Sequence, residues 1–310
     1  MIPTSIQTSC RCRGIATLMT ICGLACATAA EEPSNSMVPA GSSISRPSEP
    51  DAPTPALREE RLVGENQQPE WTTRRRFATV RSYVLPPWQF EFEQWWSGFF
   101  PRVGRGEHLF QEEISVGLPY RFQVDVYENH EINSASTWRH QGVATEMRYA
   151  FADWGKIPLN PTIYLEWKFD NNDIPDAGEI KLLFTEEIAP RWHWGMNLFY
   201  EQEMSGTREI EWGVSHAISY TLIDEKLAVG VEMQFNHVTE HESRSAPSLE
   251  LLVGPSVQWR PTPRTHLDIV PLMGVTPDAP RVWAWVVFGV DFGPGRDKGA
   301  PVAPISSRSR

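Results

Sequence analysis

Acidic side chains recur at every second position along the hydrophobic stretches of this chain. Glu91 lies between Phe90 and Phe92, and Glu232 follows Val231. Because successive side chains of an extended strand point to opposite faces, the acids and the apolar residues of each stretch occupy separate faces. The acidic positions predicted on the polar face are Glu91, Glu93, Glu113, Asp125, Glu146, Glu166, Glu201, Glu203, Glu211, Glu232, Glu250, Asp268 and Asp291, and the basic positions are Arg148, Lys168, Lys181 and Arg260.

A polar face of this composition could line a water-filled passage. Carboxylates confined in a narrow space focus a negative potential, which favours cations and polar neutral molecules over anions. The alternative is that the carboxylates serve structure, through hydrogen bonds and ion pairs that fill a narrow interior. Since the basic partners are few, we expect several carboxylates to be hydrated, or to be protonated because like-charge repulsion raises their pKa values, and we favour the passage.

The residues that could support catalysis or metal binding do not form a complete site. Ser215 and His216 are adjacent, so in a strand they point to opposite faces and cannot form a nucleophile–base pair. His237 and His241 have a spacing that suits zinc on a helix, but they lie in a polar stretch predicted as a loop, without a third distant ligand. We therefore predict no catalytic residue, no metal site and no cofactor.

The elements that must hold the polar face are long β-strands. Strict alternation extends over residues 163–169, 192–200 and 227–236, whereas a helix would place these side chains all round its surface. The stretch from Trp88 to Phe292 accommodates about 12 strands of about 10 to 13 residues, the length of a tilted membrane-spanning strand. A soluble sandwich or lipocalin-like barrel would alternate similarly, but soluble strands usually have about 5 or 6 residues. The sequence predicts an all-β, antiparallel, up-and-down transmembrane barrel.

The predicted connections alternate in kind along the chain. Short turns at the inner end and longer polar loops at the outer end are typical of bacterial outer-membrane barrels. An even strand number then places both chain ends in the periplasm. The expected outer loops are residues 101–106, 129–139, 170–178, 205–208, 236–248 and 276–281, and the expected inner turns are 117–120, 153–160, 189–191, 221–226 and 261–264.

The first residues have the composition of a signal peptide. Arg11 and Arg13 precede an apolar stretch at 14–26, and small residues at 27–30 suit cleavage. We therefore assign residues 1–30 to a signal peptide. All four cysteines lie in this stretch, so the mature chain would hold none. A lipoprotein is the alternative, although the residues before the cysteines fit a lipidation motif poorly.

Two further stretches lack an apolar period. Residues 31–76 are rich in Pro, Ser, Ala and Glu, which predicts a disordered periplasmic linker before a barrel at 77–292. Residues 293–310 have the composition of a disordered tail. The run Arg74–Arg76 at the end of the linker suits either a solvated charge run or contact with anionic headgroups at the inner leaflet.

Two stretches resemble one group of outer-membrane barrels. Residues 112–126 combine an acidic strand, a Gly-Leu turn and an Arg-Phe strand, and residues 227–232 follow a turn. They resemble the meta-pathway phenol-degradation transporter family. This resemblance implies passive passage of small organic molecules and no catalytic residue. The stretch Phe288–Phe292 is similar to the aromatic last-strand signal of barrel assembly, although further residues follow it here.

The predicted function is that of an outer-membrane channel in a Gram-negative envelope, with an acidic lumen that favours cationic or polar neutral solutes. Its expected partners are membrane lipids, small-molecule solutes and the barrel-assembly machinery. A net charge of −11 argues against nucleic acid. The alternatives are a non-conducting barrel that serves as adhesin, scaffold or assembly partner, which an ordered plug in the lumen would favour, and a barrel-wall lipid hydrolase.

Overall fold

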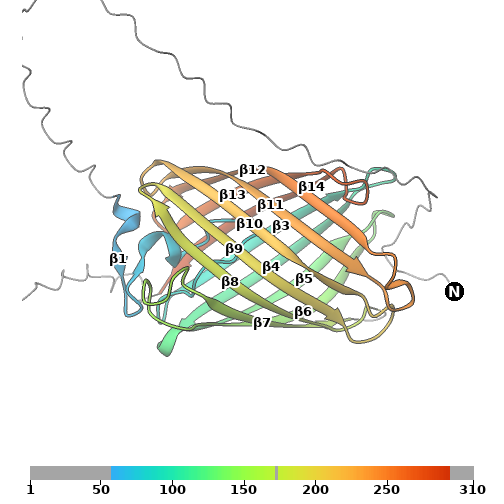
Figure 1. The fold of residues 1–310 in the computed structure, drawn as a ribbon, viewed down its shortest axis with the longest axis horizontal. Helices are drawn as coiled ribbons and strands as arrows, with labels where there is room; N and C mark the ends of the chain where they lie inside the picture. Colours follow the sequence, from blue (N-terminus) through green and yellow to red (C-terminus); the bar gives the residue numbers. More distant parts are fainter. Residues whose placement is uncertain (1–56, 172–173, 294–310) are drawn as a thin grey trace, which may run out of the picture. The chain divides into compact units, whose positions relative to one another are not determined.

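The computed structural model describes residues 57–171 and 174–293, which contain a closed barrel of twelve antiparallel strands. Each strand pairs with the one before it, and the last pairs with the first to close the ring (Figure 1). The predicted up-and-down barrel is therefore confirmed. The strands are β3 (Phe90–Phe100), β4 (Glu107–Leu118), β5 (Phe122–Ile132), β6 (Trp138–Ala150), β7 (Thr162–Asp170), β8 (Ala177–Ala189), β9 (Trp192–Glu203), β10 (Ile210–Ile223), β11 (Leu227–Thr239), β12 (Ser248–Thr262), β13 (Thr265–Gly274) and β14 (Val282–Phe292).

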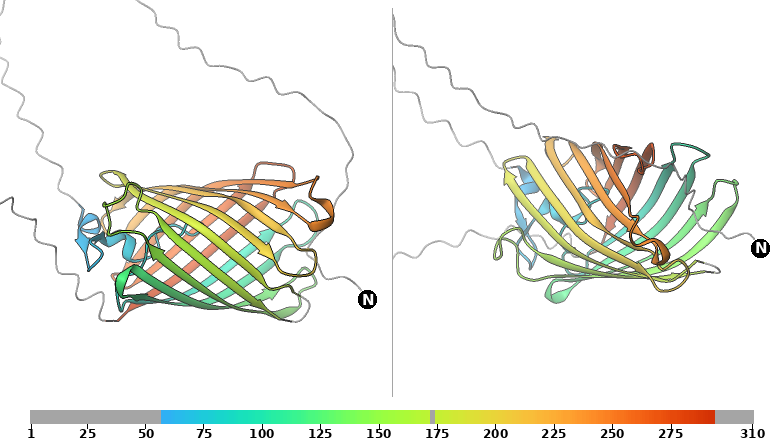
Figure 2. Two further views of the ribbon diagram at one scale, coloured as in Figure 1. Left: turned by 60° about the horizontal axis from the view of Figure 1, so that its bottom comes forward. Right: turned by 45° about the vertical axis from the view of Figure 1, so that its right-hand side comes forward.

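The strands are long and strongly tilted. Their lengths range from 9 residues in β7 to 15 in β12, whereas strands of soluble proteins usually have about 5 or 6. Figure 2 shows them running obliquely around the wall, the geometry that closing a sheet into a barrel requires. Within the described ranges, no helix is long and apolar enough to span a membrane.

Inward and outward residues alternate along the strands as predicted. In β5, Gln123 and Asp125 are buried, whereas Val126 between Asp125 and Tyr127 is 45% exposed. The outer wall is therefore apolar and the inner wall polar, the reverse of a soluble barrel. Large apolar residues exposed on the strands include Ile114, Val126, Val143, Met147, Leu165, Trp167, Ile180, Leu198, Trp212, Val231, Val257, Ile269 and Phe288.

The connections between strands lie where the sequence pattern predicted them. Each expected loop or turn overlaps an observed connection between consecutive strands. Two-residue turns at 190–191 and 263–264 contrast with the eight-residue connection at 240–247, which contains η4 (His241–Ser243). The 151–161 connection is long for a turn end, as the sequence already indicated.

The chain before β3 is folded, and we call residues 57–89 the plug segment. It contains η1 (Arg58–Glu60), β1 (Leu62–Val63), β2 (Gln68–Pro69) and η2 (Glu70–Thr73). The prediction of a disordered linker reaching residue 76 is therefore wrong over residues 57–76. The stretch has no apolar period because it forms no core of its own, and its partners are polar side chains of the barrel. Residues 1–56, including the predicted signal peptide, and the tail at 294–310 lie outside the described residues.

Candidate functional site in the barrel lumen

The plug segment covers one end of the barrel and enters its lumen, as the blue ribbon in Figure 1 shows. Its first part, up to Arg74, binds the connections at the turn end. These contacts are Trp154 N to Asn66 O (3.0 Å), Arg191 N to Glu60 Oε1 (2.6 Å), Arg58 N to Asp224 Oδ2 (2.8 Å) and Arg74 Nη1 to Pro263 O (3.1 Å).

The predicted polar-face residues lie on the inner wall in two groups. Those toward the turn end are buried, and those toward the loop end are half-buried. The buried residues are Glu91, Glu93, Glu113, Asp125, Glu146, Arg148, Glu166, Glu232, Arg260, Asp268 and Asp291, and the half-buried residues are Lys168, Lys181, Glu201, Glu203, Glu211 and Glu250.

Arg81 of the plug segment lies among the buried carboxylates. Its Nη2 is 2.9 Å from both carboxylate oxygens of Glu113 and 3.4 Å from Oε2 of Glu146. Its Nη1 is 3.8 Å from Oε2 of Glu93. Burial would lower the pKa of Arg81, but the carboxylates of Glu113, Glu146 and Glu93 raise it well above the ordinary arginine value. Arg81 is therefore a permanent cation that offsets charges from three strands.

Arg75 makes the most directional of these pairs. Its Nε and Nη2 donate to the two oxygens of Glu93, each at 2.6 Å. The guanidinium carbon lies 4.3 Å from the ring centre of Trp95. Two parallel charge-assisted hydrogen bonds and a cation–π contact, with both side chains buried, fix the position of the plug segment in the lumen.

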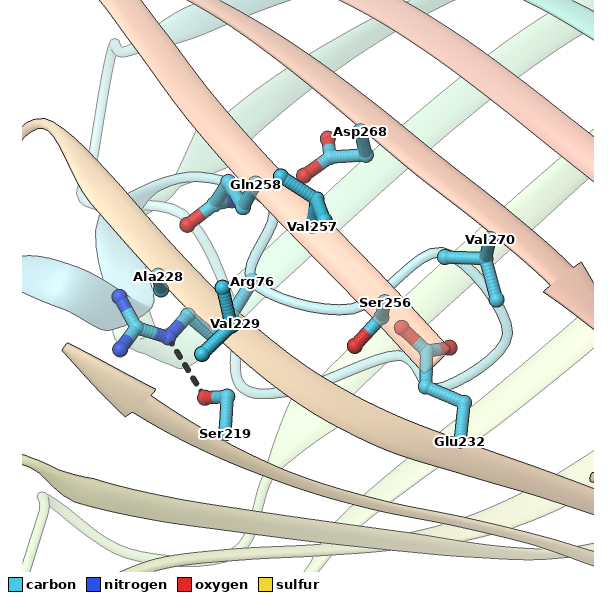
Figure 3. A pocket seen from close by; sticks show the side chains of 10 residues that line it. All are labelled: Arg76, Ser219, Ala228, Val229, Glu232, Ser256, Val257, Gln258, Asp268 and Val270. Atoms are coloured by element: carbon cyan, nitrogen blue, oxygen red, sulfur yellow. Dashed lines mark hydrogen bonds between the residues drawn. The ribbon is translucent and has the colours of Figure 1, made fainter. Parts of the chain in front are cut away.

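A second cluster lies nearer the turn end, around Arg76 (Figure 3). Its Nε donates to Ser219 Oγ at 3.0 Å, and its Nη2 donates to Thr221 Oγ1 at 2.6 Å. Its Nη1 lies 3.3 Å from both oxygens of Glu59, which Arg260 approaches to 3.7 Å. Burial raises the pKa of Glu59, but Arg76 and Arg260 lower it further, so that it ends below its ordinary value.

The backbone of the plug segment is also bound by barrel side chains. Thr79 donates its N–H to Glu232 Oε2 at 2.8 Å and its hydroxyl to the same oxygen at 2.6 Å. Leu85 N–H donates to Gln123 Oε1 at 2.7 Å. An irregular buried chain needs such partners because it has no neighbouring strand to pair with.

Small residues on the wall admit the apolar side chains of the plug segment. Phe77 and Val80 are buried in a cluster with Ala217. A Cβ atom at Gly195 would lie 2.8 Å from Cγ1 of Val80, so a larger residue there would push the segment away. Phe77 and Val80 therefore face the β9–β10 wall at close range.

The plug segment corrects two sequence-based expectations. Arg74, Arg75 and Arg76 are 4 to 7% exposed, so they form neither a solvated charge run nor a contact with lipid headgroups. They also supply the cations that the strands lack. Glu93, Glu113 and Glu232 are bound by the plug segment and are therefore not among the several hydrated carboxylates that the sequence led us to expect. The excess of acidic residues over basic ones in the strands, together with the arginine run that precedes the strands, was the signal that could have predicted these ion pairs.

The free space of the lumen is uneven. A cavity of ≈ 360 Å³ lies between the plug segment and the loop end. Beside the segment, two cavities measure ≈ 10 and ≈ 20 Å³, about the space that one water molecule needs. The large cavity is lined on its turn-end side by Ala78, Thr79 and Arg81, so the plug segment separates this cavity from the turn end.

The histidines and serine considered for chemistry lie apart. Ser215 is buried on the inner wall, whereas His216 lies on the outer wall, where Trp194 Nε1 donates to its Nε2 at 2.6 Å. His237 stacks on Trp212 at 4.7 Å. The buried group Glu91, Glu93 and His266 was not predicted as a unit, because it joins β3 to β13. The two ring nitrogens of His266 form hydrogen bonds with carboxylates. Nε2 lies 3.2 Å from Oε1 of Glu91, and Nδ1 lies 2.6 Å from Oδ2 of Asp268.

Comparison with known proteins shows the fold. No family model matches the chain, and no curated protein matches it. Among solved structures, an outer membrane channel from Pseudomonas putida F1 is similar at a TM-score of 0.54 and 7% identity, over 70% of this chain and 100% of that one. The NanC porin is similar at a TM-score of 0.45 and 12% identity, over 66% of this chain and 100% of that one. The KdgM porin, in complex with disordered oligogalacturonate, is similar at a TM-score of 0.43 and 9% identity, over 66% of this chain and 98% of that one. The resemblance to the phenol-degradation transporters stays a prediction, and the chain shares its fold with the Pseudomonas putida channel.

Proposed function

We propose that this chain is an outer-membrane channel for small solutes whose lumen is closed by its own plug segment. The apolar outer wall and the polar inner wall support a barrel surrounded by lipid, with membrane-length strands. The observation that carries the proposal is the placement of Arg75 and Arg81 in the lumen, where they bind carboxylates of β3, β4 and β6.

Displacing the plug segment changes the charge of the passage. Arg74, Arg75, Arg76 and Arg81 leave with the segment, while Glu93, Glu113, Glu146 and Glu232 stay on the wall. The opened lumen therefore carries a surplus of carboxylates and favours cationic or polar neutral solutes. Opening and selectivity are then two results of one movement.

The second candidate is a non-conducting barrel, because the plug segment is held so extensively. Its side chains and backbone bind residues of β3, β4, β5, β6, β9, β10, β11 and β12. A segment held on so many sides could be a permanent core of an adhesin or scaffold.

Planar-bilayer conductance of the purified chain separates the two candidates. The wild type should show a low open probability, and Arg75→Ala/Arg81→Ala should raise it several-fold, with a reversal potential that favours cations. Glu93→Gln and Glu113→Gln, added to the opened variant, should reduce this selectivity. Absence of conductance in both the wild type and a variant whose plug segment exchanges freely would establish the non-conducting barrel instead.

A further inference from the structure

The ≈ 360 Å³ cavity has the size of a small-molecule pocket, and its walls differ in chemistry. One wall carries Trp95 on β3 and Trp283 and Trp285 on β14. The facing wall carries carboxylates and lysines of β7 to β10. In the ring, β14 and β8 are six strands apart in either direction, so these walls lie opposite each other across the lumen.

The aromatic wall is held by stacking and a hydrogen bond, and it already contacts an arginine of the plug segment. Trp283 and Trp285 stack with ring centres 4.8 Å apart, and Trp283 Nε1 donates to Ser97 Oγ at 3.0 Å. Arg75 lies over the ring of Trp95, which belongs to the same wall. The indole faces are therefore suited to an apolar or cationic group of ring size.

The facing wall is acidic after its internal pairs are formed. Lys168 Nζ is 2.7 Å from Glu201, and Lys181 Nζ is 2.7 Å from Glu179. The side chain of Glu211 also lines the cavity, and within the described ranges it makes no hydrogen bond and no ion pair shorter than 4.0 Å, although Lys168 attracts it from farther away. Burial and the neighbouring acids disfavour the charged form of such a carboxyl group, and a cation bound beside it in the cavity would stabilise that form.

We propose that this cavity binds an organic cation, with its ammonium group at Glu211 and its apolar body against Trp283 and Trp285. An anion of the same shape would meet Glu211 and Glu201, and a neutral molecule would gain only the aromatic contact. The inference deepens the proposed function by giving the solute class that the loop end would capture before the plug segment opens.

Titration calorimetry of the full-length chain in detergent tests this with benzylamine, which is cationic at neutral pH, benzyl alcohol and benzoate. Benzylamine should bind at least about tenfold more tightly than benzyl alcohol, and benzoate should not bind measurably. Glu211→Gln should weaken benzylamine binding about tenfold and leave benzyl alcohol unchanged. Glu250→Gln is the matched control, since Glu250 lies on the same polar face but does not line the cavity.

Equal affinities for the amine and the alcohol, or equal effects of Glu211→Gln and Glu250→Gln, would overturn the inference. Trp283→Leu gives a second readout, because it should weaken both benzylamine and benzyl alcohol. Conductance distinguishes this failure from that of the proposed function. Benzylamine binding by a barrel that never conducts would keep the site and remove the channel, whereas conductance without binding would keep the channel and remove the site.

Discussion

Arg75 and Glu93 form a buried ion pair on which the position of the plug segment depends. Their side chains are 4% and 0% exposed, so Arg75→Ala removes two direct hydrogen bonds from a buried carboxylate, to which Arg81 comes no closer than 3.8 Å. Such a loss costs about 3 to 5 kcal/mol in buried pairs. We expect hydrogen–deuterium exchange of residues 74–89 to rise steeply in this variant.

The matched control for this pair removes both charges. Arg75→Met/Glu93→Gln should recover most of the protection, because no uncompensated charge remains. Unchanged exchange in Arg75→Ala alone would show that the pair does not hold the segment.

Glu59 makes the docking of the plug segment sensitive to acid. Its pKa in the docked segment is below the ordinary value, because Arg76 and Arg260 outweigh the effect of burial. A lowered pKa contributes stability above the ordinary value, and this stability is lost as the pH falls through the lowered one. The contribution of Glu59 to docking should therefore be constant near neutral pH and weaken below about pH 4.

The difference in tryptophan emission between the otherwise identical Trp71 and Trp71→Phe chains can follow this transition, because Trp71 is buried with its ring centre 4.5 Å from that of His193. Glu59→Gln should weaken docking at neutral pH and flatten the acid step. An identical acid midpoint in the wild type and in Glu59→Gln would mean that other carboxylates control the release.

At the scale of elements, the end of the plug segment pairs with β4. Trp88 N–H donates to Gly117 O at 2.7 Å, and Gly117 N–H donates to Gln89 O at 2.9 Å. A Cβ atom at Gly117 would lie 2.1 Å from the carbonyl oxygen of Pro86. Gly117→Ala should therefore displace residues 86–89 and lower the free energy of unfolding by about 1 to 3 kcal/mol.

Denaturant unfolding measures this loss, and Gly178→Ala is its control. The methyl group added at Gly178 would meet only side-chain atoms, at 3.2 Å or more. A similar midpoint shift in both variants would show that the β4 contact has no special weight.

The strands and the plug segment differ in how far the sequence predicts them. A strand such as β11 reveals itself because one face must meet an apolar surrounding and the other a polar one, which imposes a period of two. Residues 57–76 carry no period, since their partners come from turns and from strands far apart in the sequence, such as β3, β10 and β12. The polar face of Glu93 and Glu232 was predictable for the same reason as the strands, whereas its arginine partners depend on long-range docking that no local pattern encodes.

At the scale of the whole molecule, the inner wall and the plug segment divide the charge between them. The wall holds most of the buried carboxylates, and the segment holds Arg74, Arg75, Arg76 and Arg81 together with Glu59. In the function that we propose, docking closes the lumen and offsets part of its negative charge, and release exposes an acidic passage. The cavity lined by Glu211 then lies between this passage and the loop end.

A disulfide lock tests most directly whether the plug segment closes the lumen. Val80 approaches the Gly195 position closely enough for a disulfide, and all four natural cysteines lie within the predicted signal peptide. In the opened Arg75→Ala/Arg81→Ala background, bilayer conductance of oxidised Val80→Cys/Gly195→Cys should be near zero and a reductant should restore it, while Val80→Cys alone and Gly195→Cys alone should not respond. Equal conductance of the oxidised and the reduced double variant would contradict closure by the plug segment.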